Sequence, residues 1–400
     1  METIISPAAS FETRPAVVSD AVAVSTSIPW YVWCLAAAVT ADVFGGYWDI
    51  SWHISIGRDT FWTPAHMMVY LAGILAGIAS GYTILTTTFG DSKEAKDNAV
   101  SVWGFRGPLG CFIAAWGGIA MLTSAPFDNW WHAAYGLDVK IISLPHSMLG
   151  LGEAMISLGT VIFISAHVNR ASGEARKNLN RLLLYVGGIV TFGSALFILE
   201  STPMEFMHTA RFYGAVTRAF PIALIAIACV SSSRWPATVM AAIYMGLFML
   251  ALWIFPLFPA QPKLGPVYQP ITHMVPLWFP VLLIVPAIAL DLLRRWAGPR
   301  WGRLKIGVLA GFVYLAACVA AQWPFADFLL SPAARNRFFG TVYFSYFDPA
   351  NITYNPYQFV GTGFESHAAF ASGMTIALFS AIIFCSIGMA LGSWLKTVQR

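Results

Sequence analysis

Apolar segments long enough to cross a lipid bilayer organise this chain. Ten of them recur along its 400 residues, at about 30–48, 64–86, 107–124, 146–168, 182–199, 213–232, 236–256, 273–293, 305–323 and 368–391. A spanning helix needs about 20 such residues. Only 10% of the chain is charged, against about 25% in a soluble domain. Because lipid offers no partners to open backbone groups, we predict an all-α fold, a polytopic transmembrane bundle of about ten helices.

The basic residues indicate how this bundle is oriented. When the loops are taken alternately, fifteen Lys and Arg residues fall on one side and six on the other. Basic residues favour the cytoplasmic side, so we predict that both termini are cytoplasmic. Residues 1–28 lack the basic start and apolar run of a signal peptide, and we expect a polar N-terminal tail there.

Glycines in the second apolar segment form a row of small residues. Gly73, Gly77 and Gly81 repeat every four residues. Small residues at this spacing let two membrane helices approach closely. We therefore predict that this face packs against another helix.

Two stretches on the predicted outer side repeat one pattern of titratable residues. Each has an aspartate, a histidine four residues later, and a second histidine thirteen or fourteen residues after that. The residues are Asp49, His53 and His66 in the first stretch, and Asp128, His132 and His146 in the second. Positions four apart share a helix face, and a proline just before the second histidine can start the next helix. A helical hairpin would therefore bring one carboxylate and two imidazoles together.

Two imidazoles and one carboxylate form a facial triad that binds a transition metal and leaves coordination positions open. Imidazole suits copper, zinc and iron, so these residues alone do not select the metal. The structural alternative is that each aspartate bonds its neighbouring histidine, while the second histidine is an interfacial residue of the kind common at membrane boundaries. Because the pattern is duplicated, we favour metal binding.

Other titratable residues near these stretches are weaker candidates. Glu205 and His208 would share one helix face, as ligands do in di-iron bundles, and Glu200 lies close by. Since this pattern occurs once, we favour a structural role for it. Asp42 and Glu153 lie within apolar segments, where ionisable groups are costly and usually paired or functional. Both lie within a few turns of the metal stretches, and we expect each to support them.

The first stretch resembles a motif in a copper-binding membrane subunit of the particulate methane and ammonia monooxygenases, a family of copper membrane monooxygenases. The shared pattern is WHxxxxRDTxxTPxH, here Trp52-His53, Arg58-Asp59-Thr60 and Thr63-Pro64-Ala65-His66. The resemblance covers about residues 30–170. It implies a copper site at the first stretch and a neighbouring copper site, tied to activity, at the second. Asp128 stands where the family has asparagine.

The apolar segments and the resemblance together predict an organisation. Residues 1–28 would be the tail and 29–170 a four-helix metal-binding core like that of the family. The remaining apolar segments predict six further transmembrane helices in 171–400, with a long outer loop at about 324–367. The resemblance also implies an activity. The expected function is that of a copper-dependent membrane monooxygenase (an oxidoreductase), or its metal-binding subunit. It would use dioxygen to oxidise a small apolar substrate at the outer face of the membrane.

The alternative is a non-catalytic copper-binding or copper-transport membrane protein. A transporter should carry ionisable residues inward through the membrane. Few occur here beyond Asp42, Glu153 and Asp291, which favours the oxygenase. The expected partners are the lipid bilayer, dioxygen and an apolar substrate, while partner subunits or a homo-oligomer stay open. The sequence carries no nucleotide-binding motif and no basic patch for nucleic acid.

Overall fold

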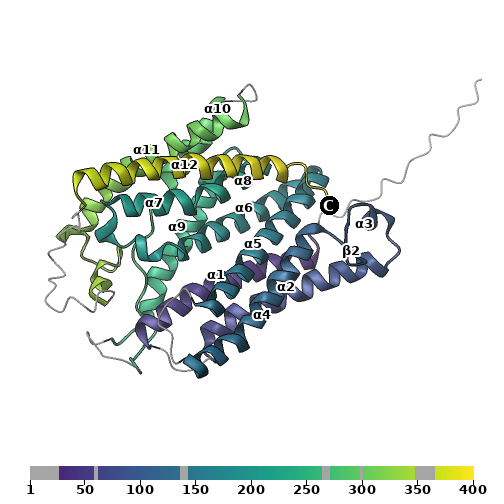
Figure 1. Cartoon of the computed structure of the whole chain (residues 1–400), viewed down its shortest axis with the longest axis horizontal. Coiled ribbons are helices and arrows are strands. Elements are labelled where there is room, and N and C mark those ends of the chain that lie inside the picture. The colour runs from purple at the N-terminus through teal and green to yellow at the C-terminus, as the bar shows by residue number, and fades with distance from the viewer. Residues whose placement is uncertain (1–26, 58–61, 136–142, 264–270, 298–300, 347–364) are drawn as a thin grey trace, which may run out of the picture.

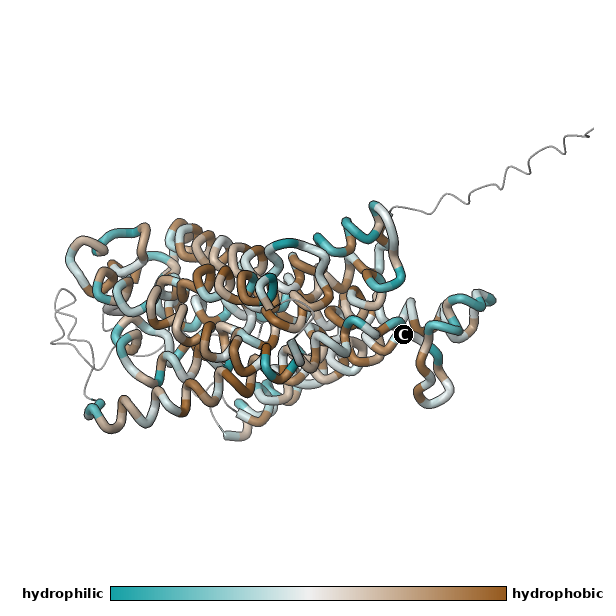
Figure 2. The backbone as a smooth tube through the Cα atoms, turned by 90° about the horizontal axis from the view of Figure 1, so that it is seen from above, coloured by the Kyte–Doolittle hydropathy of each residue, from teal (hydrophilic) through white to brown (hydrophobic). Residues whose placement is uncertain are grey.

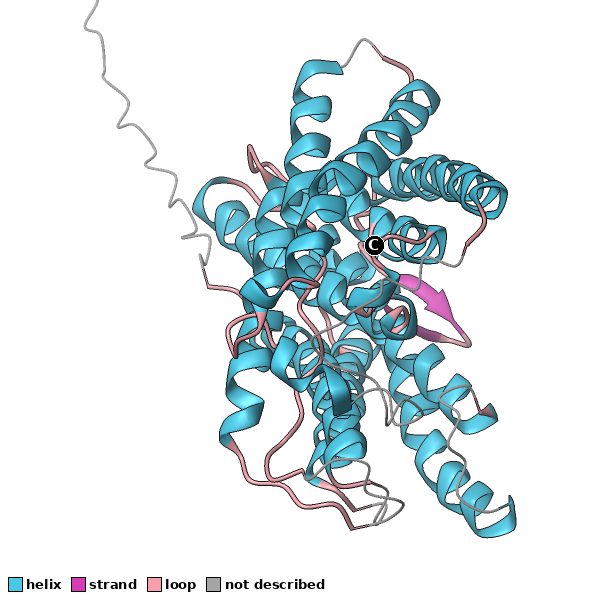
Figure 3. Cartoon of the chain, turned by 90° about the vertical axis from the view of Figure 1, so that its left-hand side faces the viewer, coloured by secondary structure: helices cyan, strands magenta, loops and turns pink. Residues whose placement is uncertain are grey.

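A computed structural model describes residues 27–57, 62–135, 143–263, 271–297, 301–346 and 365–400. Most of the predicted tail, the loop positions Arg58, Asp59 and Thr60, and much of the predicted outer loop lie outside these residues. The regular secondary structure of the described chain is helical, apart from one short hairpin (Figure 3). Eight of its helices are long and apolar enough to cross a membrane. The prediction of an all-α, polytopic membrane bundle is therefore confirmed.

The long helices run side by side along the long axis of the molecule (Figure 1). Figure 2 shows a hydrophobic middle section between two hydrophilic ends. This distribution fits a bundle whose middle contacts lipid and whose ends contact water.

The first half of the chain forms a group of four long helices. They are α1 (Trp30–Ser55), α2 (Pro64–Phe89), α4 (Leu109–Tyr135) and α5 (Leu144–Arg170). Within this group α1 packs on α2 and α5, and α4 packs on α2 and α5. The connection from α2 to α4 contains a short helix and a hairpin that the sequence did not lead us to expect. These are α3 (Lys93–Asp97), β1 (Val100–Val102) and β2 (Phe105–Gly107).

Glycines hold α4 and α5 in close contact. Gly117 faces Gly152, and a Cβ added to Gly117 would lie only 2.7 Å from the Gly152 carbonyl oxygen. Gly110 and Gly159 meet in the same way, seven residues further along each helix. The two backbones therefore touch directly, which is how small residues pair membrane helices.

The predicted glycine row on α2 is only partly correct. Gly73 does contact another helix, since a Cβ added to Gly118 of α4 would lie 2.9 Å from the Gly73 carbonyl oxygen. The Gly77 nitrogen lies 3.6 Å from the same added Cβ, so Gly77 also borders α4, although a Cβ added to Gly77 itself would meet nothing within 4 Å. A Cβ added to Gly81 would meet nothing within 4 Å either. The packing prediction is therefore wrong for Gly81, because spacing alone does not say how far the contact with the opposite helix extends.

The second half of the chain packs beside the first. Its helices are α6 (Gly173–Leu196), α7 (Ala210–Ala219), α8 (Pro221–Val230), α9 (Pro236–Ile254), α10 (Ile284–Ala297), α11 (Arg303–Leu329) and α12 (His367–Leu395). The sixth predicted segment is thus broken into α7 and α8, where Pro221 begins a new helix. Helix α6 contacts α1 and α5, while α11 and α12 lie on the far side of the molecule from α2 and α4 (Figure 1).

The eighth predicted segment differs most from expectation. The sequence predicts a helix over 273–293, but α10 begins only at Ile284, and the residues from 273 up to that point are not helical. Pro276 and Pro280 explain this, because each lacks a backbone N–H and clashes with a preceding helical turn. Side chains of other helices form hydrogen bonds with some of the backbone groups of this segment. For example, the Leu282 N–H donates to Oε1 of Gln322 at 3.0 Å. Non-helical backbone is tolerated at membrane depth only with such partners.

The start of α1 and the C-terminus lie at the same end of the bundle. The rings of Tyr31 and Phe163 of α5 are 6.1 Å apart. Near the end of α5, the Asn169 amide donates to the carbonyl oxygens of Leu395 and Val398. The hairpin lies at this end too (Figure 1). That this end is cytoplasmic stays a prediction.

Candidate metal centre

The first predicted triad comes together where α1 ends and α2 begins. Oδ1 of Asp49 lies 3.4 Å from Nε2 of His53 and 3.1 Å from Nε2 of His66. The two imidazole rings are 5.9 Å apart between centroids. Within the described part of the chain, these three residues form the one group whose potential ligand atoms all lie within 4.8 Å of one another.

Local sequence chemistry builds this hairpin. Helix α1 ends before Gly57, whose φ of 85° is left-handed and favours glycine. Thr63 caps α2, because its hydroxyl accepts a hydrogen bond from the His66 N–H at 3.1 Å. Pro64 occupies the first turn of α2, where its missing N–H costs nothing. The cap and the proline together fix His66 at the very start of α2.

The non-helical segment before α10 braces the end of α1. The Ser51 hydroxyl donates to the Val275 carbonyl oxygen at 2.7 Å. The Val275 N–H donates in turn to the Ser55 hydroxyl at 2.7 Å. Both serines are buried and flank His53 on the same helix. The second half of the chain therefore helps to position a residue of the first triad.

The second predicted triad forms between α4 and α5. Oδ1 of Asp128 lies 3.3 Å from Nε2 of His132 and 3.6 Å from Nε2 of His146. The imidazole centroids are 6.5 Å apart, so this triad is wider than the first. The Ser143 hydroxyl contacts Nδ1 of His146 at 2.9 Å and also caps α5. This contact orients the imidazole so that Nε2 points at Asp128, as partners of ligating histidines do.

The donor atoms fit a transition metal. Two metal–ligand bonds of about 2.1 Å that meet at the metal at an angle of about 90–110° place their donor atoms about 3.0–3.4 Å apart. The first triad falls within this range, and the second is slightly wider. Oδ1 of Asp49 and Oδ1 of Asp128 are both buried without a regular hydrogen bond. A buried carboxylate oxygen facing two imidazoles in this way is suited to ligation.

The charge state of Asp49 also suits a ligand. Asp49 lies just beyond the apolar segment 30–48. Burial alone would raise the pKa of its carboxyl group, but the contacts with His53 and His66 outweigh burial and hold the pKa below its usual range. Asp49 is therefore an anionic donor at neutral pH, which offsets part of the charge of a bound cation.

A polar layer lies one helical turn inward from the two triads. Tyr70 follows His66 by four residues, and Ser124 precedes Asp128 by four. The Tyr70 hydroxyl bonds to the Ser124 side chain and interacts electrostatically with both Asp49 and Asp128. Tyr70 thus lies between the two triads. Sequence reasoning missed it, although its spacing from His66 places it on the same helix face.

Asp42 and Glu153 lie a further turn inward. Their carboxyl groups interact electrostatically with one another, and Glu153 also interacts with Asp49 of the first triad. The two residues come from α1 and α5, so only the tertiary fold brings them together. Their expected supporting role for the metal stretches stays a prediction.

The weaker cluster does not form the expected helix face. Glu200 and Glu205 lie in the short 3-10 helices η1 (Leu199–Ser201) and η2 (Met204–Phe206), and His208 follows them. Nε2 of His208 lies 3.1 Å from Oδ1 of Asp327 on α11. The α-helical spacing assumed for Glu205 and His208 is therefore wrong. No metal-binding group of three among the described residues includes this cluster.

No protein-family model, no curated protein and no solved structure matches this chain. The description of the site therefore rests on its own geometry. Two triads of the same composition lie at the same end of the bundle. Each is built by the end of one long helix and the start of the next.

Proposed function

We propose that this protein is a copper-dependent membrane monooxygenase, or the metal-binding subunit of one. It oxidises a small apolar substrate with dioxygen at the outer face of a bacterial inner membrane. The observation that carries the proposal is the pair of carboxylate–imidazole triads at one end of a membrane bundle. Two imidazoles and a carboxylate leave coordination positions for an exogenous ligand. The resemblance of the first stretch to the copper monooxygenases favours copper over zinc or iron.

The two triads have different roles in this proposal. Bound copper would supply the activation of dioxygen, and we assign that chemistry to the second triad, Asp128, His132 and His146. Oδ1 of Asp128 lies 3.6 Å from Nε2 of His146, which is longer than either such distance in the first triad, and the two imidazole centroids are 6.5 Å apart against 5.9 Å. The second triad therefore has more room. Asp128 replaces the family's asparagine and adds an anionic donor.

The surroundings of the second triad support lateral entry of an apolar substrate. Trp130 and Tyr135 are exposed aromatic side chains on the same part of α4 as the triad. Trp130 stacks on Phe127, and Trp131 contacts Tyr135. An apolar molecule dissolved in the bilayer would meet this aromatic surface before it reaches His132. The lipid bilayer is then both the solvent of the protein and the source of its substrate.

The ionisable residues argue against copper transport. A transporter needs donors that continue inward from the entry site. Asp42 and Glu153 lie two turns inward, but Asp291 is engaged elsewhere. Its carboxylate accepts hydrogen bonds from the N–H groups of Ala237 and Thr238 at the start of α9. Among the described residues, the inward series of carboxylates therefore stops at Glu153 and Asp42.

Elemental analysis and oxygen uptake test the proposal together. We expect protein purified from copper-replete cells, alone or with any partner subunits that co-purify, to contain about two copper atoms per chain. We expect it to consume oxygen when given a short hydrocarbon or ammonia. Bound copper without substrate-dependent oxygen uptake would support the non-catalytic copper-binding alternative. A preparation without copper would contradict both.

A further inference from the structure

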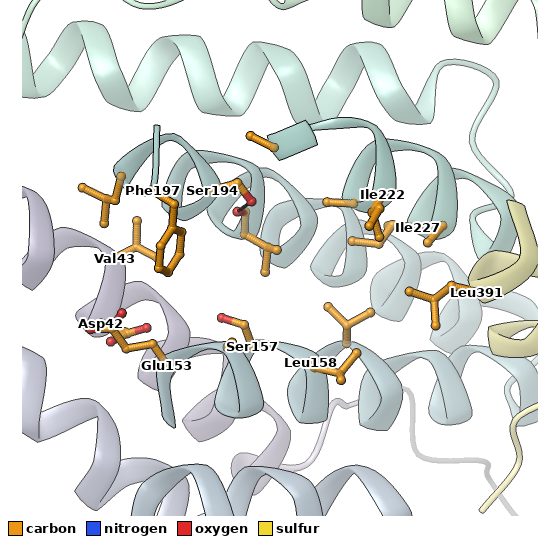
Figure 4. A pocket seen from close by; sticks show the side chains of 18 of the residues that line it. Asp42, Val43, Glu153, Ser157, Leu158, Ser194, Phe197, Ile222, Ile227 and Leu391 are labelled. Atoms are coloured by element: carbon orange, nitrogen blue, oxygen red, sulfur yellow. Dashed lines mark hydrogen bonds between the residues drawn. The ribbon is translucent and has the colours of Figure 1, made fainter. Parts of the chain in front are cut away.

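A cavity lies inside the bundle, inward of the two triads. Its volume is about 300 Å³, which is within the range of small-molecule sites. Its walls come from α1, α5, α6, α8 and α12. Most of the lining is apolar, but Figure 4 shows Asp42 and Glu153 side by side at one end, with Ser157 near Glu153. Ile222, Ile227 and Leu391 lie toward the other end.

The carboxyl groups of this cavity have no complementary charge. Asp42 is only 4% exposed, and its Oδ1 is buried without a hydrogen-bond partner. The neighbouring charged group is Glu153, another acid. None of the described residues that line the cavity is Lys, Arg or His. Burial favours the neutral form of a carboxyl group, whereas a neighbouring cation stabilises the charged form. The acidic end of the cavity is therefore suited to a positively charged hydrogen-bond donor.

The cavity is open to the lipid side of the bundle. Leu158 of α5 and Phe197 at the end of α6 both line it. Their side chains are also 40% and 70% exposed on the surface of the protein. A molecule dissolved in the bilayer can therefore reach the acidic end by passing between α5 and α6. Such a molecule must itself be largely apolar.

We infer that this cavity binds a primary amine carried on an apolar body. The ammonium group lies at Asp42 and Glu153, and the apolar body extends toward Ile222 and Leu391. An ammonium has three donors, enough for both carboxylates and a serine hydroxyl. A primary alkylamine, like the lysine side chain, is protonated at neutral pH. A neutral or anionic amphiphile would leave the two acids without a countercharge.

This site is separate from the metal triads. Asp42 precedes Asp49 by seven residues, and Glu153 follows His146 by seven. Seven residues are two helical turns, or about 10 Å along a helix. An amine at the carboxyl pair therefore does not bind a metal held by the triads. The inference goes beyond the proposed oxygenase function and does not depend on copper.

Equilibrium dialysis of the full chain in lipid nanodiscs tests the inference. Radiolabelled hexylamine is the probe, hexanol is a neutral probe of equal chain length, and binding to empty nanodiscs is subtracted. We expect saturable hexylamine binding that is at least tenfold tighter than hexanol binding, because hydrogen bonds to charged groups are the stronger ones. Asp42→Asn with Glu153→Gln should weaken hexylamine binding by about tenfold or more and change hexanol binding far less.

A steric variant and its control complete the test. Ser157→Leu fills the cavity and should weaken binding of both probes, whereas Ser372→Leu, on an exposed part of α12, should change neither. If the double variant fails to insert into the membrane, Asp42→Asn and Glu153→Gln are tested singly in its place. Equal hexylamine binding to the wild type and the carboxyl variants, or no saturable binding to the wild type, would overturn the inference. Copper content measured on the same samples reports on the oxygenase proposal separately.

Discussion

Replacing Gly117 by alanine should loosen the helix pair that carries the second triad. The added Cβ would lie 2.7 Å from the Gly152 carbonyl oxygen and 2.8 Å from the Ile156 nitrogen, roughly 0.6 Å short of the 3.4 Å at which ordinary contact begins. Both neighbours are backbone atoms of α5, so neither can rotate away. The helices must separate instead. Overpacking of this kind costs about 1–3 kcal/mol.

Part of that cost is offset, because alanine favours a helix over glycine by up to about 1 kcal/mol. We therefore expect Gly117→Ala to lower the free energy of unfolding by up to about 2 kcal/mol. Gly77→Ala is the matched control, since its added Cβ meets nothing within 4 Å. That variant keeps only the gain in helix propensity and should be as stable as the wild type or slightly more stable.

The assay is equilibrium unfolding of both variants in the same detergent, followed by their helical signal. Copper content is measured alongside. Separation of α4 from α5 should weaken metal retention by the second triad, while the first triad, on α1 and α2, keeps its metal. Equal unfolding free energies for Gly117→Ala and Gly77→Ala would refute the close contact of α4 with α5.

Three further predictions follow from the same structure. Asp128→Ala combined with His132→Ala should remove one copper atom per chain and abolish oxygen uptake; full retention of both would exclude the second triad from the mechanism. Asp291→Ala should lower the unfolding free energy by about 1–2 kcal/mol, because its carboxylate caps the start of α9, whereas Glu174→Ala, at an exposed position, should have little effect. Acidification should release the metal, because its ligands bind it only in their deprotonated forms. The pKa of the Asp49 carboxyl group lies below its usual range, so this ligand stays ionised in mildly acidic solution. Dialysis at stepped pH measures the release, and metal retained at every acidic step at which the protein stays folded would contradict the prediction.

The two triads could be predicted from sequence because their geometry is local. Asp49 and His53 share a helix face by their spacing, and the turn before Pro64 returns the chain as a new helix that begins beside them. The distances of Asp49 from both imidazoles agree with that reasoning. The same logic applies to the hairpin of α4 and α5.

Features that depend on tertiary contacts could not be predicted in this way. The pairing of Asp42 with Glu153 requires α1 to lie beside α5, and neither helix encodes that contact by itself. The position of Tyr70 between the triads depends likewise on how α2 meets α4.

Two errors have local causes that hydropathy does not register. Pro276 and Pro280 prevent a helix in a segment that is apolar enough to form one. The stretch that contains Glu205 and His208 folds as short 3-10 turns, so its three-residue spacing does not create a helix face. His208 instead contacts Asp327, far away in sequence.

The most direct test of the metal centre compares three histidine variants by elemental analysis. His53→Ala and His66→Ala each remove one donor of the first triad, whereas His367→Ala removes an exposed histidine at the start of α12. Loss of a contact that supports a metal ligand lowers metal affinity by roughly 10–100-fold. Removal of the ligand itself should lower the affinity by at least as much. We predict that each of the first two variants loses about one copper atom per chain and that His367→Ala loses none. Unchanged copper in both His53→Ala and His66→Ala would contradict the account.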